Sequence, residues 1–199
     1  MKKINKTSLL ERLKNDSRQI ILQTNYLLQE DPEILLLQPG EGRWSVTQVI
    51  EHLNSYGRYY LPHIQTSLTS VKQSTKEVYS PGFLGDYFTK SMLPKSNGQV
   101  TNKMQAPKAH RPPIDIDSSV VLDEFLKQEH ELLECLDKAA IADLQKIRIP
   151  ISLTRFIKLQ LGDTFRFLIA HHQRHFVQVQ NTLKQVKAFK TKELQFHGA

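Results

Sequence analysis

Three of the eight histidines fall within five residues near the C-terminal end of the sequence. In the segment 167–178, His171 and His175 are four residues apart, so they share one face of a helix. This spacing lets one helix offer two imidazoles to a single metal ion. Gln178 continues the same face, whereas His172 points about 100° away. Two ligands do not make a stable site, so a third must come from another element.

Spacing alone leaves open which pair of histidines would bind. His172 falls within the apolar stripe of the predicted helix, whereas His171, His175 and Gln178 lie along one edge of that stripe. His172 and His175 are three residues apart and are also sterically possible as a ligand pair. A histidine inside the stripe is, however, more often a packed core residue than a ligand.

Four segments have the apolar periodicity of an amphipathic helix. The first begins at Ser8, where Ser8 and Glu11 match the capping-box pattern. Four such helices without a convincing set of strands predict an all-α four-helix bundle, in which ligand sites are built from side chains on facing helices. The predicted helices cover residues 8–31, 45–72, 118–138 and 161–188.

The second predicted helix carries another candidate ligand. Ser45 and Gln48 form a capping box that predicts where this helix begins. His52 lies on the flank of its apolar stripe, with Gln48 and Tyr56 one turn to either side. Taken alone, such a histidine is more often a hydrogen-bonded bundle residue than a ligand.

Two stretches lack the helical pattern. Residues 73–117 are repeatedly interrupted by proline and glycine, with room for one short helix at about 86–92. A connection of this length is either disordered or functional, and its aromatic residues favour a segment packed over the bundle as the wall or lid of a pocket. Residues 144–159 alternate in part like a strand, but Pro150 interrupts the pattern and no partner strand is evident. We therefore predict an extended connection there.

Composition restricts the class of protein. The 199 residues, of which 39% are hydrophobic, suit a single domain spanning 1–199. No stretch approaches the apolar length that spans a bilayer. The single cysteine, Cys135, excludes an internal disulfide and fits a reducing compartment. We expect a cytoplasmic protein without a membrane partner.

The formal net charge of +7 raises the question of nucleic-acid binding. The excess is spread over both termini and the middle of the chain, and a lysine series near the C-terminus is typical of a solvated tail. A nucleic-acid partner is therefore not favoured. The tail series consists of Lys184, Lys187, Lys190 and Lys192. The histidines without a partner at ligand spacing, predicted to lie on the surface, are His63, His110, His130 and His197.

Several of these features together resemble the DinB/YfiT-like superfamily. The resemblance covers nearly the whole chain in helix order and loop placement. It implies a bundle with up-down-down-up helix directions, often dimeric, in which one histidine of the second helix and two of the last bind zinc or nickel. The matching residues are Trp44-Ser45 leading to His52-Leu53, Ala106-Pro107-Lys108 in the insertion, Leu161-Gly162-Asp163, and Ala170-His171 followed by His175 and Gln178.

By this resemblance the metal ligands are His52, His171 and His175. Relatives often carry an acid at the position of His172, so a carboxylate beside the ligands is absent here or the local ligand set is altered. The residues that could orient ligands or substrate are Gln48, Tyr56, His172 and Gln178.

The chemistry of such a triad follows from its ligand count. Three neutral imidazoles leave a divalent ion with at least one open position, where the pKa of water can fall to about 7 or a thiol can be held as thiolate. Characterised relatives include thiol-dependent S-transferases and isomerases that use bacillithiol or mycothiol, and others are proposed metal-dependent hydrolases. The resemblance implies one of these activities on a small-molecule substrate, with a low-molecular-weight thiol as cofactor in the transferase case.

The sequence does not identify a general base. Gln48, Tyr56 and Gln178 are poor bases near neutral pH, and Asp86 and Glu77 are the acids of the insertion that could reach the site. The alternative is a non-catalytic bundle, in which metal is structural or absent and the protein acts through a protein or nucleic-acid partner. Phosphate binding would weaken steeply with salt, whereas a three-histidine metal site would fail as the pH drops.

Overall fold

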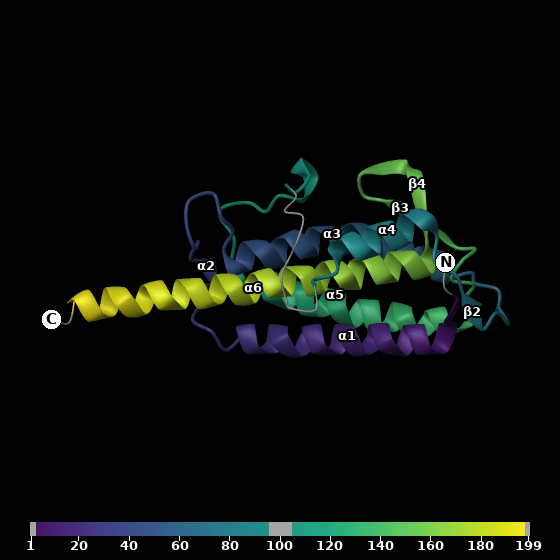
Figure 1. Cartoon of the computed structure of the whole chain (residues 1–199), viewed down its shortest axis with the longest axis horizontal. Coiled ribbons are helices and arrows are strands. Elements are labelled where there is room, and N and C mark those ends of the chain that lie inside the picture. The colour runs from purple at the N-terminus through teal and green to yellow at the C-terminus, as the bar shows by residue number, and fades with distance from the viewer. Residues whose placement is uncertain (1–2, 96–104, 198–199) are drawn as a thin grey trace.

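Four long helices lie side by side and form the body of the molecule (Figure 1). The structure is a computed structural model; it describes residues 3–95 and 105–197, with side chains as far as residue 191. Helices α1 and α6 run in one direction along the bundle and α3 and α5 in the other (Figure 1), so the predicted all-α, up-down-down-up bundle is confirmed. The four helices are α1 (Lys6–Leu27), α3 (Val46–Leu68), α5 (Ser118–Lys138) and α6 (Leu161–His197).

The core lies where these four helices meet. Helices α1 and α3 each contact both α5 and α6, so the four enclose a common centre. Burying a side chain the size of leucine or phenylalanine contributes about 1.5–3 kcal/mol, and this shared core holds the facing helices together around the candidate site. Among the largest fully buried side chains are Leu9, Ile20, Ile50, Leu53, Tyr60, Phe125, Leu132 and Phe165.

The helix starts test the two capping predictions. The box at the start of α3 is confirmed: Ser45 Oγ accepts from the Gln48 N–H at 3.2 Å, and Gln48 Oε1 accepts from the Ser45 N–H at 3.0 Å. The box predicted at Ser8 is wrong. Helix α1 begins two residues earlier, and Asn5 Oδ1 accepts from the Ser8 N–H at 2.9 Å.

Helix α6 is longer than predicted. It continues past residue 188 and projects beyond the other helices (Figure 1). Lys187 pairs with Glu30 at 2.6 Å and Lys190 with Asp31 at 2.9 Å, at the corner between α1 and α2 (Pro32–Leu36). These ion pairs favour helix beyond the predicted end, although the side chains of Lys192 and His197 lie outside the described residues. Within the described chain, no helix combines the length and apolarity needed to cross a membrane.

The first half of the insertion is attached to α6. Strand β2 (Val78–Tyr79) pairs antiparallel with β1 (Ile4–Asn5), and the short helix predicted in this region is α4 (Phe83–Met92), which packs along α6. Asp163, in the first turn of α6, accepts from the Tyr79 hydroxyl at 2.5 Å and from the Gly82 N–H at 2.9 Å. The insertion is therefore fixed to the same helix that carries the histidine cluster.

The prediction of an unpaired extended connection at 144–159 is wrong. After the short 3-10 turn η2 (Ala139–Ile141), strands β3 (Arg148–Ile151) and β4 (Thr154–Gln160) pair as an antiparallel hairpin that projects from the bundle (Figure 1). The Tyr59 hydroxyl donates to the Ile151 carbonyl at 3.1 Å, and the Tyr60 hydroxyl accepts from the Ser152 N–H at 3.1 Å. A two-stranded hairpin tolerates Pro150 because both of its strands are edge strands.

Candidate metal centre

Three histidines from two facing helices converge inside the bundle. His52 belongs to α3, and His171 and His175 belong to successive turns of α6. One possible ligand nitrogen of each lies within 4.8 Å of the other two. The ring centroids lie 5.2 Å apart for His52 and His171, 4.8 Å for His52 and His175, and 4.5 Å for His171 and His175. Zinc–imidazole bonds are about 2.0–2.1 Å long, so the three rings are grouped closely enough to be candidate ligands of one ion.

Hydrogen bonds orient two of the three rings. His52 Nδ1 lies 2.7 Å from the His110 carbonyl oxygen, which can only accept, so Nδ1 carries the proton and Nε2 has a free lone pair. His175 Nδ1 lies 2.9 Å from Gln178 Oε1 and is oriented in the same way. An outer hydrogen bond of this kind fixes the tautomer of a metal-binding histidine. Gln178 therefore has the position expected of a residue that orients a ligand.

The third ring has an unsatisfied nitrogen. Among the described residues, His171 Nδ1 is buried without a hydrogen-bond partner. Buried polar atoms normally have one, so this imidazole has a bonding capacity that no described residue takes up. The donor set of three imidazoles therefore fits a divalent metal ion.

Burial keeps the three rings neutral. The low-polarity surroundings lower the pKa of His52 to about 4 and that of His175 to about 3. Burial likewise places the pKa of His171 well below the usual value for an imidazole. Neutral imidazole is the form that binds metal, so the site is in its ligand form at physiological pH.

Residues 105–117 of the insertion pack beside this cluster. The His110 ring, at the end of η1 (Lys108–His110), stacks on Tyr56 with centroids 3.9 Å apart, and its Nδ1 lies 2.9 Å from Ser55 Oγ. Gln48 Nε2 donates to the Pro113 carbonyl at 3.3 Å. The prediction that His110 lies on the surface is wrong, because its ring is buried against α3. His63 and His130 are exposed as predicted.

His172 faces a different part of the core. Its Nδ1 lies 2.6 Å from Glu129 Oε1 on α5, although the two atoms are not aligned as a hydrogen bond. The other carboxylate oxygen accepts from Ser17 Oγ on α1 at 2.5 Å, and the His172 ring packs against Phe125 with centroids 5.4 Å apart. The structure therefore brings His171 and His175, and not His172, together with His52. The sequence analysis did not predict that Glu129 would be buried beside His172. Its position within the apolar stripe of helix 118–138 could have indicated a buried charge.

A comparison with protein-family models matches residues 18–179 to the DinB superfamily. The chain belongs to the DinB superfamily. The matched range extends from α1 into α6 and contains all three histidines, so the resemblance noted in the sequence is confirmed. Searches of curated proteins and of solved structures found no match.

In this DinB-superfamily chain, the two acids predicted to reach the site, Asp86 and Glu77, lie elsewhere. Asp86 accepts from Arg166 at 2.8 Å and pairs with Lys90 at 2.7 Å. Glu77 is exposed, and its carbonyl accepts from the Lys6 N–H near the N-terminus. Neither carboxylate is placed to accept a proton beside the histidines.

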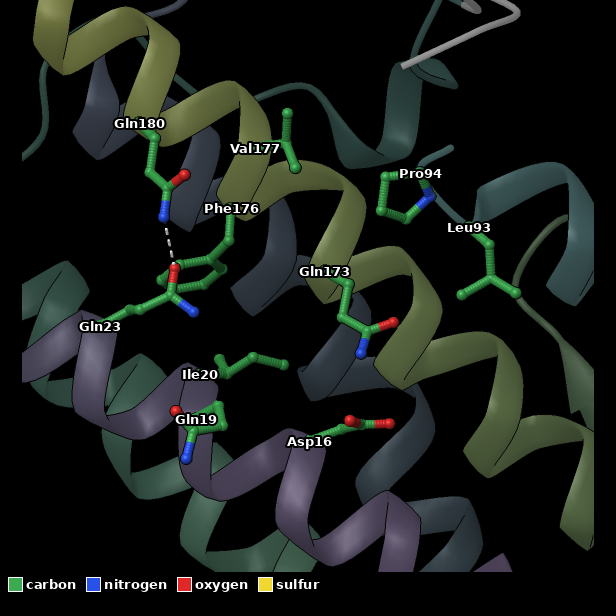
Figure 2. Close-up of a pocket in the computed structure, with 10 residues that line it drawn as sticks. All are labelled: Asp16, Gln19, Ile20, Gln23, Leu93, Pro94, Gln173, Phe176, Val177 and Gln180. Carbon is green, nitrogen blue, oxygen red and sulfur yellow. Dashed lines mark hydrogen bonds between the residues drawn. The ribbon is translucent and has the colours of Figure 1, made fainter. Parts of the chain in front are cut away.

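Figure 2 shows a cleft of about 420 Å³ elsewhere on this DinB-superfamily bundle, between α1, α6 and the residues that follow α4. Gln180 of α6 donates to Gln23 of α1 across it at 2.8 Å. Asp16 also lines the cleft, and burial raises the pKa of its carboxyl group. The α6 residues in the lining face α1, whereas the metal candidates on α6 face α3. The cleft is therefore separate from the histidine cluster.

Proposed function

We propose that this chain binds a divalent metal ion, zinc or nickel, through His52, His171 and His175. The observation that carries the proposal is the convergence of three neutral imidazoles, two of which have their Nδ1 atoms hydrogen-bonded away from the cluster. A three-histidine set leaves a divalent ion with an open position for water or a substrate atom. That arrangement supports metal-dependent hydrolysis or thiol-dependent S-transfer on a small molecule.

The residues around the triad have supporting roles in this proposal. Gln178 and the His110 carbonyl hold His175 and His52 in the tautomer that presents Nε2. Burial raises the pKa of Tyr56 to about 12, so its hydroxyl stays protonated near neutral pH and serves as a hydrogen-bond donor to substrate rather than as a base. The segment 105–117 limits the access of water from one side.

The experiment that tests metal binding is elemental analysis of untagged protein purified without chelator. We expect near-stoichiometric zinc or nickel in the wild type and its loss in His52→Ala and His175→Ala. His63→Ala, which removes an exposed histidine from the same helix as His52, is the matched control and should retain the metal. Metal that persists without His52, or wild-type protein that cannot be loaded, would overturn the three-histidine assignment.

Loaded protein then distinguishes the two activities. A thiol S-transferase should consume an electrophilic test substrate only when a low-molecular-weight thiol is added, whereas a hydrolase should turn over ester or amide substrates without thiol. Stoichiometric metal with neither activity would favour the alternative of a structural metal in a non-catalytic bundle.

A further inference from the structure

The β3–β4 hairpin exposes apolar side chains at its outer end. Phe156 is 97% exposed, Leu153 65% and Ile157 39%. Isolated exposed apolar residues are normal on a protein surface, but these three lie within five consecutive residues. The hairpin also has a buried side, formed by Ile149 and Leu159. One side is therefore docked on the bundle, while the other presents apolar groups to solvent.

An irregularity in strand register creates this display. Pro150 pairs with Lys158, but the next residue, Ile151, pairs with Thr154. Residues 155–157 of β4 therefore have no Cα partner on β3. A bulge of this kind bends the strand and redirects its side chains. Phe156 and Ile157 therefore lie in an exposed part of β4 that is not paired with β3.

The charge on the hairpin has one sign. From residue 147 to residue 160 the chain contains Arg148, Arg155 and Lys158 and no acidic residue. All three cations are exposed, and none pairs with an acid in the part of the chain that the structure describes. The outer end of the hairpin thus combines apolar side chains with unneutralised positive charge, on a molecule whose net charge is already +7.

We propose that the β3–β4 hairpin is a peripheral docking surface for anionic phospholipid membranes. Phe156, Leu153 and Ile157 would enter the boundary between headgroups and acyl chains, while Arg155 and Lys158 contact lipid phosphates. A fluid surface suits a protruding hairpin because it needs no preformed pocket. Two copies of this chain meeting through their hairpins would instead bring like charges together.

This inference goes beyond the metal site and does not depend on it. The expectation of no membrane partner rested on the lack of a segment able to span a bilayer, and a peripheral contact needs no such segment. The metal analysis and the membrane test can therefore succeed or fail separately.

The test is sedimentation of the full-length protein with vesicles of phosphatidylcholine alone or mixed with phosphatidylglycerol. We expect binding to the mixed vesicles only, and weaker binding as salt is added. Phe156→Ser should weaken binding by about tenfold or more, because it removes the exposed aromatic ring that would leave water on the membrane. Lys158→Glu should weaken it by more than about fivefold, the effect of losing one cation at a membrane surface.

Two control variants remove an exposed aromatic ring or reverse a positive charge at positions outside the hairpin. Tyr26→Ser removes a 73% exposed ring from α1, and Lys127→Glu changes the net charge as Lys158→Glu does but lies on α5. Both should bind mixed vesicles as the wild type does. Phe156→Trp adds a second readout, because its fluorescence should shift to the blue on mixed vesicles if the ring leaves water, against the constant background of Trp44.

Several results would overturn the proposal. If wild-type protein binds neither vesicle type, or if Phe156→Trp fluorescence does not shift, the hairpin does not contact the membrane. Equal losses in Lys127→Glu and Lys158→Glu would assign binding to net charge rather than to the hairpin. A dimer that Phe156→Ser dissociates in light scattering, without vesicle binding by the wild type, would assign the surface to a second copy of the chain.

Discussion

Acidification should destabilise the metal-free protein through its buried histidines. Burial holds the pKa of His52 at about 4 and that of His175 at about 3, compared with 6.5 for an unperturbed imidazole. At a pH between these values the unfolded chain takes up protons that the folded chain does not. The contribution that these neutral histidines make to the free energy of unfolding is therefore complete above about pH 6.5. It is lost as the pH falls toward about 4 for His52 and about 3 for His175.

The size of the effect follows from the pKa values. One pKa unit corresponds to about 1.36 kcal/mol. At about pH 5, some 1.5 units below the unfolded pKa, each of these two histidines should lower the free energy of unfolding by about 2 kcal/mol relative to neutral pH. Together they should remove about 4 kcal/mol, which is large against a typical total of about 5–15 kcal/mol.

Urea denaturation with chelator present, at about pH 7 and about pH 5, measures this loss. His175→Asn is the informative variant, because an asparagine amide can still donate to Gln178 but does not titrate. Its free energy of unfolding should fall by about 2 kcal/mol less than that of the wild type over this pH range. His63→Asn, at an exposed position, should behave as the wild type. Equal losses in the wild type and His175→Asn would refute the neutral, buried state of His175.

Three further outcomes are expected. Gly162→Ala should lower the melting temperature, because its Cβ would meet Tyr79 Cε2 at 2.6 Å and overpacking of this kind costs about 1–3 kcal/mol; thermal unfolding measures it. Gln178→Leu should weaken zinc binding by about 10–100-fold, because it removes the acceptor of the His175 Nδ1–H; competition with a chromophoric chelator measures it, and Gln180→Leu is the control. Zinc at about 100 times its Kd should raise the free energy of unfolding by about 2.7 kcal/mol, seen as a higher urea midpoint at neutral pH.

Each of these three predictions would be contradicted by a specific result. A Gly162→Ala protein that melts like the wild type would show that the Tyr79 ring moves aside without penalty. Unchanged zinc affinity in Gln178→Leu, or an equal loss of zinc affinity in Gln180→Leu, would show that Gln178 does not orient His175. A urea midpoint that does not respond to zinc would contradict metal binding to the folded chain.

The features that depend on local spacing could be predicted from the sequence. His171 and His175 share a helix face because they are one turn apart, and the reciprocal bonds of Ser45 and Gln48 fix where α3 begins. The choice between His171 and His172 as partner of His175 could not be made from spacing. It depends on how α6 is rotated against α5, where Glu129 meets His172.

Contacts between distant segments could not be predicted. His110 lies 58 residues from His52 along the chain and reaches it through an irregular connection without periodicity, so no pattern indicated that its carbonyl would orient a metal candidate. The hairpin was missed for a related reason. Strand β4 carries exposed residues on both faces from 155 to 158 and lacks the alternation that marks a half-buried strand.

One uninterrupted helix carries both Asp163, which fixes the start of the insertion, and the two histidines that face His52. Each residue of an α-helix advances about 1.5 Å and turns about 100°. A deletion or insertion of one residue between Asp163 and His171 would therefore turn both histidines away from α3, even with every side chain retained. Relatives that keep the site should vary in length only in their connections, and an alignment without gaps over 163–175 becomes a criterion for recognising them.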